Sequence, residues 1–147
     1  MARRAVRREK DKRRIEPDLP ALPRNFRVTI DGIEIGFAQI SRIGSETAEL
    51  PARGRAKLVH RYPNILLRRA LGRDRSLYQW REAIMAGKKG RRRVEIRWLD
   101  DTGEGERGSW ILENAWPWRW SGPIFDANAT EIAMEEIELA YERLIWR

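Results

Sequence analysis

The sequence has 147 residues, with 30 Lys and Arg against 22 Asp and Glu, so its formal net charge is +8. The absence of cysteine excludes disulfides, thiolate nucleophiles and cysteine-ligated metals, and a single histidine excludes a multi-histidine metal site. An apolar fraction of 41% with seven tryptophans exceeds what disordered chains contain, and no apolar run approaches the ~20 residues of a membrane span. We therefore expect a soluble, basic, single-domain protein without a membrane anchor.

Most of the excess positive charge lies in the first 14 residues. They contain eight basic side chains against Glu9 and Asp11, a net charge of +6, which leaves only +2 for the other 133 residues. Such a segment cannot bury enough apolar surface to offset its ordering entropy, and three prolines follow it. We expect residues 1–24 to form a flexible, basic, proline-containing N-terminal arm and residues 25–147 to form the folded domain. The arm fits a nucleic-acid or anionic-surface contact, a solubilising tail, or a segment that orders on a partner subunit.

The first part of the domain has the period-two pattern of β-strands. Residues 26–30 alternate apolar and polar side chains, Asp31-Gly32 is a strong hairpin signal, and the alternation resumes over residues 33–37. Residues 41–57 are polar and contain several breakers, which predicts a loop with at most edge-strand character. Residues 58–70 hold two short strand-like pieces.

One helix is predicted over about residues 75–86. Leu77, Trp80 and Ile84 fall on one helical face, Asp74 or Ser76 can cap the start, and Gly87 ends the helix.

A second hairpin follows the helix. Residues 93–98 alternate again, a polar turn follows at residues 100–103, and Trp110 and Leu112 begin the return strand. Several short strands with a single helix predict a mainly β fold, a small β-barrel or sandwich with one flanking α-helix.

The C-terminal segment has two interpretations. Apolar residues between 133 and 144 are spaced as a helical stripe, and Asn128 with Glu131 could form a capping box. The same residues also fit a strand with a bulge between Met134 and Ile137. Periodicity alone slightly favours the helix.

No residue pattern supports catalysis, a cofactor or a metal site. His60 lies among cations and is typical of a strand residue that faces a neighbour or water. Asp100-Asp101 suits a turn better than a metal site. The glycines at 103, 105 and 108 lack the context of a phosphate loop. The glutamates of the last segment look like its solvated face rather than an acid–base pair: Glu135, Glu136 and Glu138.

The charges within the domain favour binding to another macromolecule. Residues 53–75 contain eight basic side chains and one acid, and residues 88–93 contain five more, so with neighbouring aromatics they resemble a nucleic-acid surface. However, the tryptophans alternate with charges at strand spacing, which is more typical of a core. Residues 124–147 hold six acids against two bases. A chain with one basic and one acidic face can dock head to tail with its own copies.

Particular stretches resemble a known family. They are Tyr-Pro-Asn-Ile-Leu-Leu-Arg-Arg at 62–69, Trp80, Arg-Arg-Val-Glu-Ile at 92–96, Asn-Ala-Trp-Pro-Trp-Arg-Trp-Ser-Gly-Pro at 114–123, and the segment 131–142. In this order, the chain from about Phe26 to its end resembles the tail-tube (inner tube) proteins of contractile phage tails and contractile injection systems.

The resemblance implies a structural protein without enzymatic activity or cofactor. It implies a small β-barrel with one flanking helix, six copies in a ring around a lumen, and rings that stack into a tube. Sheath contraction would drive this tube through a target envelope. The implied partners are further copies, sheath and baseplate or tube-initiator and terminator proteins, with a protein effector or DNA as lumen cargo. Assembly is expected in the bacterial cytoplasm, and the C-terminal segment is expected to be a strand.

Two departures from the family keep alternatives open. Residues 50–55 are basic where the family usually has an acidic stretch that meets the next ring, and the arm over residues 1–14 is not part of the general pattern. The chain could therefore be the bulk tube subunit or a specialised baseplate-proximal initiator ring. The alternative function is a small basic nucleic-acid-binding domain that uses the arm and the loops around residues 53–75.

Overall fold

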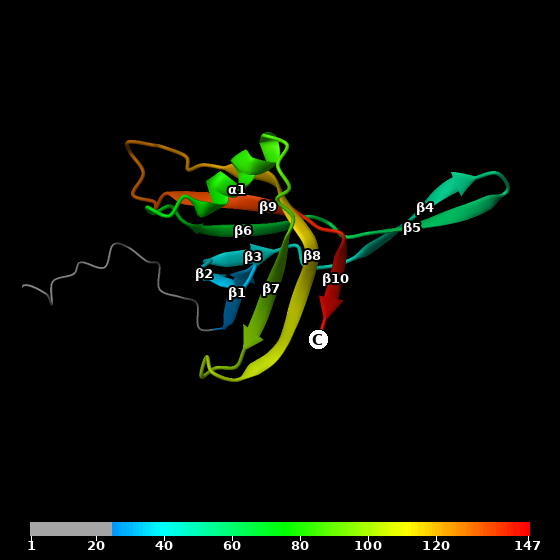
Figure 1. Ribbon diagram of the computed structural model, residues 1–147, viewed down its shortest axis with the longest axis horizontal. Coiled ribbons are helices and arrows are strands. Elements are labelled where there is room, and N and C mark those ends of the chain that lie inside the picture. Colours follow the sequence, from blue (N-terminus) through cyan, green and yellow to red (C-terminus); the bar gives the residue numbers. More distant parts are fainter. Residues whose placement is uncertain (1–24) are drawn as a thin grey trace, which may run out of the picture.

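The computed structural model describes residues 25–147, so the expected basic arm over residues 1–24 lies outside the described residues. The described chain forms ten strands and one helix, α1 (Ser76–Met85). The strands are β1 (Phe26–Ile30), β2 (Ile33–Ile35), β3 (Gln39–Ser41), β4 (Glu46–Ala52), β5 (Arg55–Arg61), β6 (Ile65–Ala70), β7 (Arg92–Leu99), β8 (Glu106–Ser121), β9 (Met134–Ala140) and β10 (Arg143–Trp146). The fold is therefore mainly β with one helix, as predicted (Figure 1).

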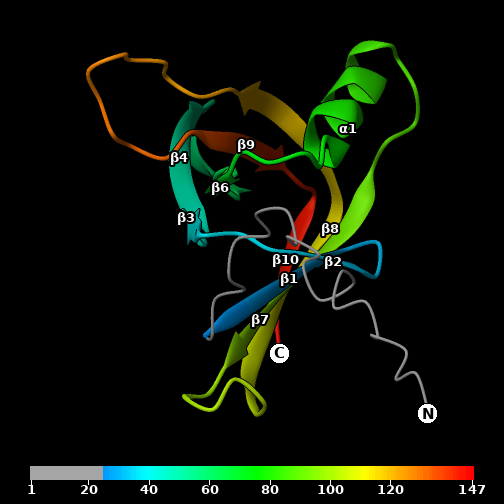
Figure 2. The same ribbon diagram turned by 90° about the vertical axis from the view of Figure 1, so that its left-hand side faces the viewer.

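The main sheet is antiparallel, with the strand order β2-β1-β7-β8-β9-β6-β3 and with β10 paired to β8. The long strand β8 joins its two halves, because its first part pairs with β7 and β10 and its second part pairs with β9. It is irregular between these parts: Asn114 has a φ of 52°, and the pairing with β9 shifts between Pro117 and Arg119. Such irregularities bend a strand and increase its twist, so the sheet curls into an open barrel (Figure 2).

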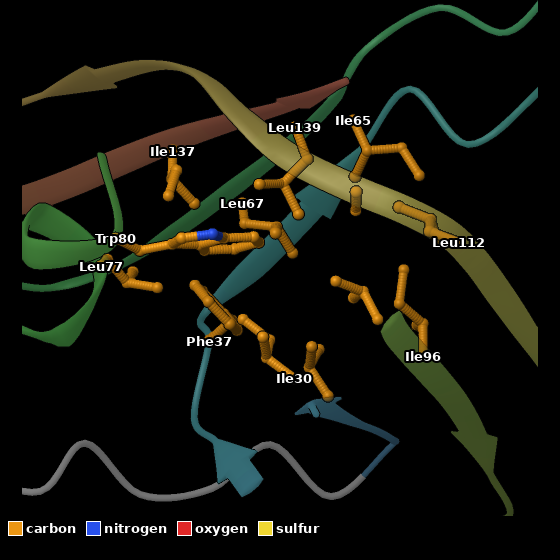
Figure 3. Packing of buried hydrophobic residues seen from close by; sticks show 13 residues of the cluster. Ile30, Phe37, Ile65, Leu67, Leu77, Trp80, Ile96, Leu112, Ile137 and Leu139 are labelled. Atoms are coloured by element: carbon orange, nitrogen blue, oxygen red, sulfur yellow. The ribbon is translucent and has the colours of Figure 1, made fainter. Parts of the chain in front are cut away.

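The inward side chains of the curled sheet form one hydrophobic core. Successive side chains leave a strand on opposite faces, so alternate residues such as Val28, Ile96 and Leu112 point inward, each at most 2% exposed. Figure 3 shows Leu77 and Trp80 reaching into this cluster from α1. Full burial of one such side chain contributes about 1.5–3 kcal/mol, so the core fixes the frame from which the surface elements project.

The predicted helix and first turn are confirmed. The helix ends before Gly87, which has a φ of 74° and donates its amide to the Ile84 carbonyl at 3.0 Å. At the start, the Asp74 carboxylate accepts a hydrogen bond from the Ser76 amide at 2.9 Å, so Asp74 rather than Ser76 supplies the polar contact. Asp31 and Gly32 have φ values of 49° and 78°, as a tight two-residue hairpin requires.

Residues 41–57, which are predicted to form a loop with at most edge-strand character, instead contain most of a regular hairpin. Residues 46–61 form the β4–β5 hairpin, which turns at Gly54 with a φ of 69°. Both faces of this hairpin are mostly exposed, so its sequence lacks the alternation by which half-buried strands are recognised. Pro51 lies within β4, where it pairs with Ala56.

The strand expected from the resemblance at the C-terminus is confirmed, although it is divided into β9 and β10. Ile137 and Leu139 are fully buried, and the alternation is regular throughout β9. No bulge is needed between Met134 and Ile137, because Glu135 takes an inward position. Asn128 and Glu131 lie in the loop before β9, so they cap no helix.

Candidate assembly surfaces

The β4–β5 hairpin projects away from the curled sheet (Figure 1). Among the described strands it pairs only with itself, from Glu46 opposite Arg61 to Ala52 opposite Arg55. Leu50 and Leu58 lie on its opposite faces and are 49% and 55% exposed. An isolated two-stranded hairpin is marginally stable in water, and both faces of this one are mostly exposed in the described chain.

The predicted basic cluster over residues 53–75 is divided between several elements. Arg53, Arg55 and Lys57 lie at or near the exposed tip of the hairpin, and Arg61 lies at the other end of β5, 3.0 Å from Glu46. The remaining cations lie in β6 or before α1. His60 lies on exposed β5, where its Nδ1 is 2.9 Å from the Thr47 hydroxyl, so it is the strand residue that the sequence predicts. The eight cations are therefore distributed over the hairpin, β6 and the segment before α1.

Glu135 is not solvated as predicted, since it is 2% exposed. It accepts hydrogen bonds from Arg69 Nε at 3.0 Å and from the Trp120 indole at 2.9 Å. Arg69 is also buried, and its Nη1 donates to the Asp74 carboxylate at 3.0 Å. Burial raises the pKa of Asp74, but hydrogen bonds from Ser76 and Arg69 outweigh it and lower the pKa overall. This network ties β6, β8 and β9 to the start of α1.

The other predicted glutamates form ion pairs on the outer face of the sheet. The Arg119 guanidinium donates to Glu138 and Glu136, each at 2.9 Å. The hydrogen bond from Arg119 lowers the pKa of Glu138 despite its partial burial, and the same contact raises the pKa of Arg119. Glu142 contacts Arg91 at 2.8 Å. The acidic face expected over residues 124–147 is thus largely neutralised within the chain.

The tryptophans are less buried than the sequence predicts. Trp80 is in the core, but Trp98, Trp118 and Trp146 are 41%, 55% and 69% exposed. Trp98, Trp110 and Trp146 lie side by side, with neighbouring centroids 6.4 and 5.5 Å apart. Their alternation with charged residues was recognised correctly, but β7 and β8 extend past the barrel, so the inward face is uncovered there (Figure 2).

The remaining sequence candidates have structural roles. Asp100 lies in the β7–β8 turn, and the hydrogen bond from the Thr102 hydroxyl lowers the pKa of its carboxyl group. Within residues 25–147, no group of three or more His, Asp or Glu side chains could hold a metal ion. The helix of the described chain is too short and polar to cross a membrane.

The described chain is a small, open antiparallel β-barrel with one helix and with several exposed large apolar side chains. Residues 23–145 match the family described as T4-like virus tail tube protein gp19, and the chain belongs to this family. It is a tail tube subunit of a contractile phage tail or an extracellular contractile injection system, a structural protein and not an enzyme.

Solved structures of contractile systems contain similar chains. A chain of the PVC extracellular contractile injection system, in its extended sheath–tube complex, is 25% identical with a TM-score of 0.68, over 88% of this chain and 93% of that chain. A chain of the anti-feeding prophage baseplate is 19% identical, with a TM-score of 0.66 over 88% and 97%. Hcp1 from Flavobacterium johnsoniae shares the fold at 15% identity, with a TM-score of 0.62 over 83% and 94%. No curated protein matches this sequence.

Proposed function

We propose that six copies of this chain form a ring around a lumen, and that the rings stack into an inner tube driven through a target envelope by sheath contraction. Sheath, baseplate and terminator proteins are the proposed partners, a protein effector or DNA is the proposed cargo, and assembly takes place in the bacterial cytoplasm. Similar chains occur in sheath–tube, terminator and baseplate complexes, the last of them six-fold symmetrised, which supports the proposal.

The β4–β5 hairpin is the observation that carries this proposal. It extends past the barrel and exposes Leu50 and Leu58 on opposite faces, beside a positively charged tip. A hairpin of this kind gains stability when a neighbouring subunit covers it. The proposed partner for the hairpin is the adjacent ring of the stack.

The proposed position is the shaft of the tube rather than the initiator ring on the baseplate. A chain of an extended sheath–tube complex is 25% identical over 88% of this chain, which supports a position in the shaft. A shaft subunit stacks on both of its faces, so purified rings should grow into long tubes. An initiator subunit would give rings that stay single.

Mass photometry and negative-stain microscopy of the full chain at low salt test the proposal. We expect rings of six copies of the 17.3 kDa chain, and tubes at higher concentration. The variant R53E/R55E should retain rings and lose tubes, because it reverses the charge of the hairpin tip. R73E/R75E makes the same charge change outside the hairpin and should still form tubes. A strict monomer at high concentration would contradict the proposal, as would salt-sensitive DNA binding without rings.

A further inference from the structure

The loop between β8 and β9, residues 122–133, contains the most exposed apolar side chains of the described domain. Ile124, Phe125 and Ile132 are 93%, 85% and 74% exposed. The loop is partly ordered by its own turn, in which the Asn128 amide donates to the Asp126 carboxylate at 2.9 Å. Exposed apolar groups gathered in one loop mark a contact with another chain.

The same loop also has a negative charge that the rest of the described chain does not neutralise. Its net charge is −2, from Asp126 and Glu131, and it contains no basic residue. Neither carboxylate forms an ion pair with a described residue, whereas the four later glutamates of the C-terminal segment all do. The partner of this loop should therefore be both apolar and basic.

A groove that is both apolar and basic lies next to the C-terminal end of α1. Its volume is about 640 Å³, and it is lined by Ile84, Lys88, Lys89, Gly90, Arg91 and Trp116. Ile84 and Trp116 provide apolar surface, and both lysines are exposed. Arg91 lies over the Trp116 ring at 5.8 Å and contacts Glu142, so the lysines supply the remaining positive charge.

The loop and the groove lie on opposite sides of the molecule. In Figure 2 the loop is at the upper left, and the segment after α1 is at the upper right. One copy cannot join its own loop to its own groove across the barrel, but two neighbouring copies can. A contact between two different surfaces, repeated from copy to copy, closes a ring when the rotation is a simple fraction of a turn.

We infer that the loop over residues 122–133 of one copy docks in the α1 groove of the next copy in the same ring. Phe125 lies against Ile84 and Trp116, while Asp126 and Glu131 face Lys88 and Lys89. The inference rests on the proposed ring assembly and names the contact that closes the ring. The other segment that could seek this groove, residues 1–14, has a net charge of +6 and would be repelled by it.

Disulfide trapping tests this contact directly, because the natural chain contains no cysteine. Oxidation of the double variant F125C/K89C should link copies into a ladder of covalent oligomers that ends at the ring. Mixed single variants F125C and K89C should give a dimer that neither variant forms alone. F125C with K57C, which places the second thiol on the hairpin, is the matched control and should give no ladder.

Charge reversal provides a second test that leaves the core intact, since all the residues changed are exposed. K88E/K89E and D126K/E131K should each raise the concentration needed for half-assembly of rings by about tenfold or more. Combining the four changes should restore assembly, because the opposite charges face each other again. R53E/R55E combined with D126K/E131K should not restore it.

The outcomes separate this inference from the proposed function. Suppose that the wild-type chain forms rings, while F125C/K89C gives no ladder of covalent oligomers and the fourfold charge variant does not recover assembly. That result would overturn the inference and leave the ring proposal standing. Absence of wild-type rings would contradict both. The inference would also be overturned if the wild-type chain bound an oligonucleotide, K88E/K89E lost this binding, and K88E/K89E still formed unchanged rings. A polyanion, and not the loop of a neighbouring copy, would then occupy the groove.

Discussion

Replacement of Arg69 by methionine should severely destabilise the domain. Arg69 and Glu135 are 6% and 2% exposed, and their ion pair lies within the sheet that β6 and β9 form. The R69M variant leaves the Glu135 carboxylate buried without its cation, which costs about 3–5 kcal/mol in comparable cases. Since a domain of this size has about 5–15 kcal/mol of total stability, the variant should lose a large share of it.

Urea unfolding followed by tryptophan fluorescence measures this loss. The experiment is performed at protein concentrations where rings do not form, so that assembly adds nothing to the free energy of unfolding. R68M is the matched control: Arg68 is the neighbouring arginine of β6, its side chain is 43% exposed, and it lies 3.4 Å from Glu136. It should cost less than about 1 kcal/mol.

The double variant R69M/E135L distinguishes an uncompensated charge from lost packing. It removes both charges, and buried ion pairs replaced by apolar residues of similar size are often as stable as the original. The Trp120 indole loses its acceptor, which should leave a deficit of about 1–3 kcal/mol. A cost of R69M no larger than that of R68M would refute the burial argument. A double variant as unstable as the sum of the single variants would refute the coupling.

Three further predictions concern pH and packing. Burial raises the pKa of Tyr141 to about 12, above its ordinary value of 10.0, so the free energy of unfolding should fall as pH rises from 10 to 12. In urea titrations at alkaline pH, Y141F should reduce this dependence on pH. Y78F is the control and should leave most of the dependence unchanged. The pKa of Glu138 is lowered from 4.5 by its hydrogen bond from Arg119, so this contribution is present at neutral pH and is lost progressively as the pH falls below 4.5. R119M should therefore cost about 1 kcal/mol at pH 7 and progressively less as the pH is lowered below 4.5 in the same unfolding assay. L112A should cost about 2–5 kcal/mol in the same unfolding assay, because Leu112 is fully buried, and a cost below 1 kcal/mol would contradict the core assignment.

An element could be predicted from sequence where its turn residues and its pattern of buried side chains indicate the same structure. Asp31-Gly32 provides the two positive φ values that its turn needs, and Leu77 with Trp80 gives α1 one buried face. The β7–β8 hairpin was predictable for the same reason, because a polar turn joins two strands whose apolar and polar side chains alternate. At the C-terminus, periodicity fits a helix slightly better than a strand, and the family resemblance decides for the strand that β9 forms. Glu135 explains why the pattern is ambiguous, since a glutamate at an inward position breaks the apolar alternation of a buried strand.

The exposed surfaces of the domain were harder to predict, because their residues do not pack against other parts of the described chain. The β4–β5 hairpin has no buried face, so its strands look like a polar loop. Trp98 and Trp146 have the spacing of core residues, but they lie near the ends of β7 and β10 and are exposed, which only the three-dimensional structure reveals. Sequence composition suggested one acidic C-terminal face. The structure instead uses Glu135, Glu136 and Glu138 within the chain.

The ion pairs within the chain leave few unpaired charges in the C-terminal segment, so electrostatic attraction between copies can contribute little to assembly. After the intrachain pairs are formed, the loop over residues 122–133 retains two negative charges, and its proposed groove retains two lysines. Exposed pairs of this kind contribute little each, and salt at 0.1 M screens charges beyond about 10 Å. The apolar side chains Ile124 and Phe125 must then supply most of the contact energy, while the charges select the correct partner surface. Ring assembly should accordingly weaken only modestly with salt, whereas F125S should abolish it at every salt concentration.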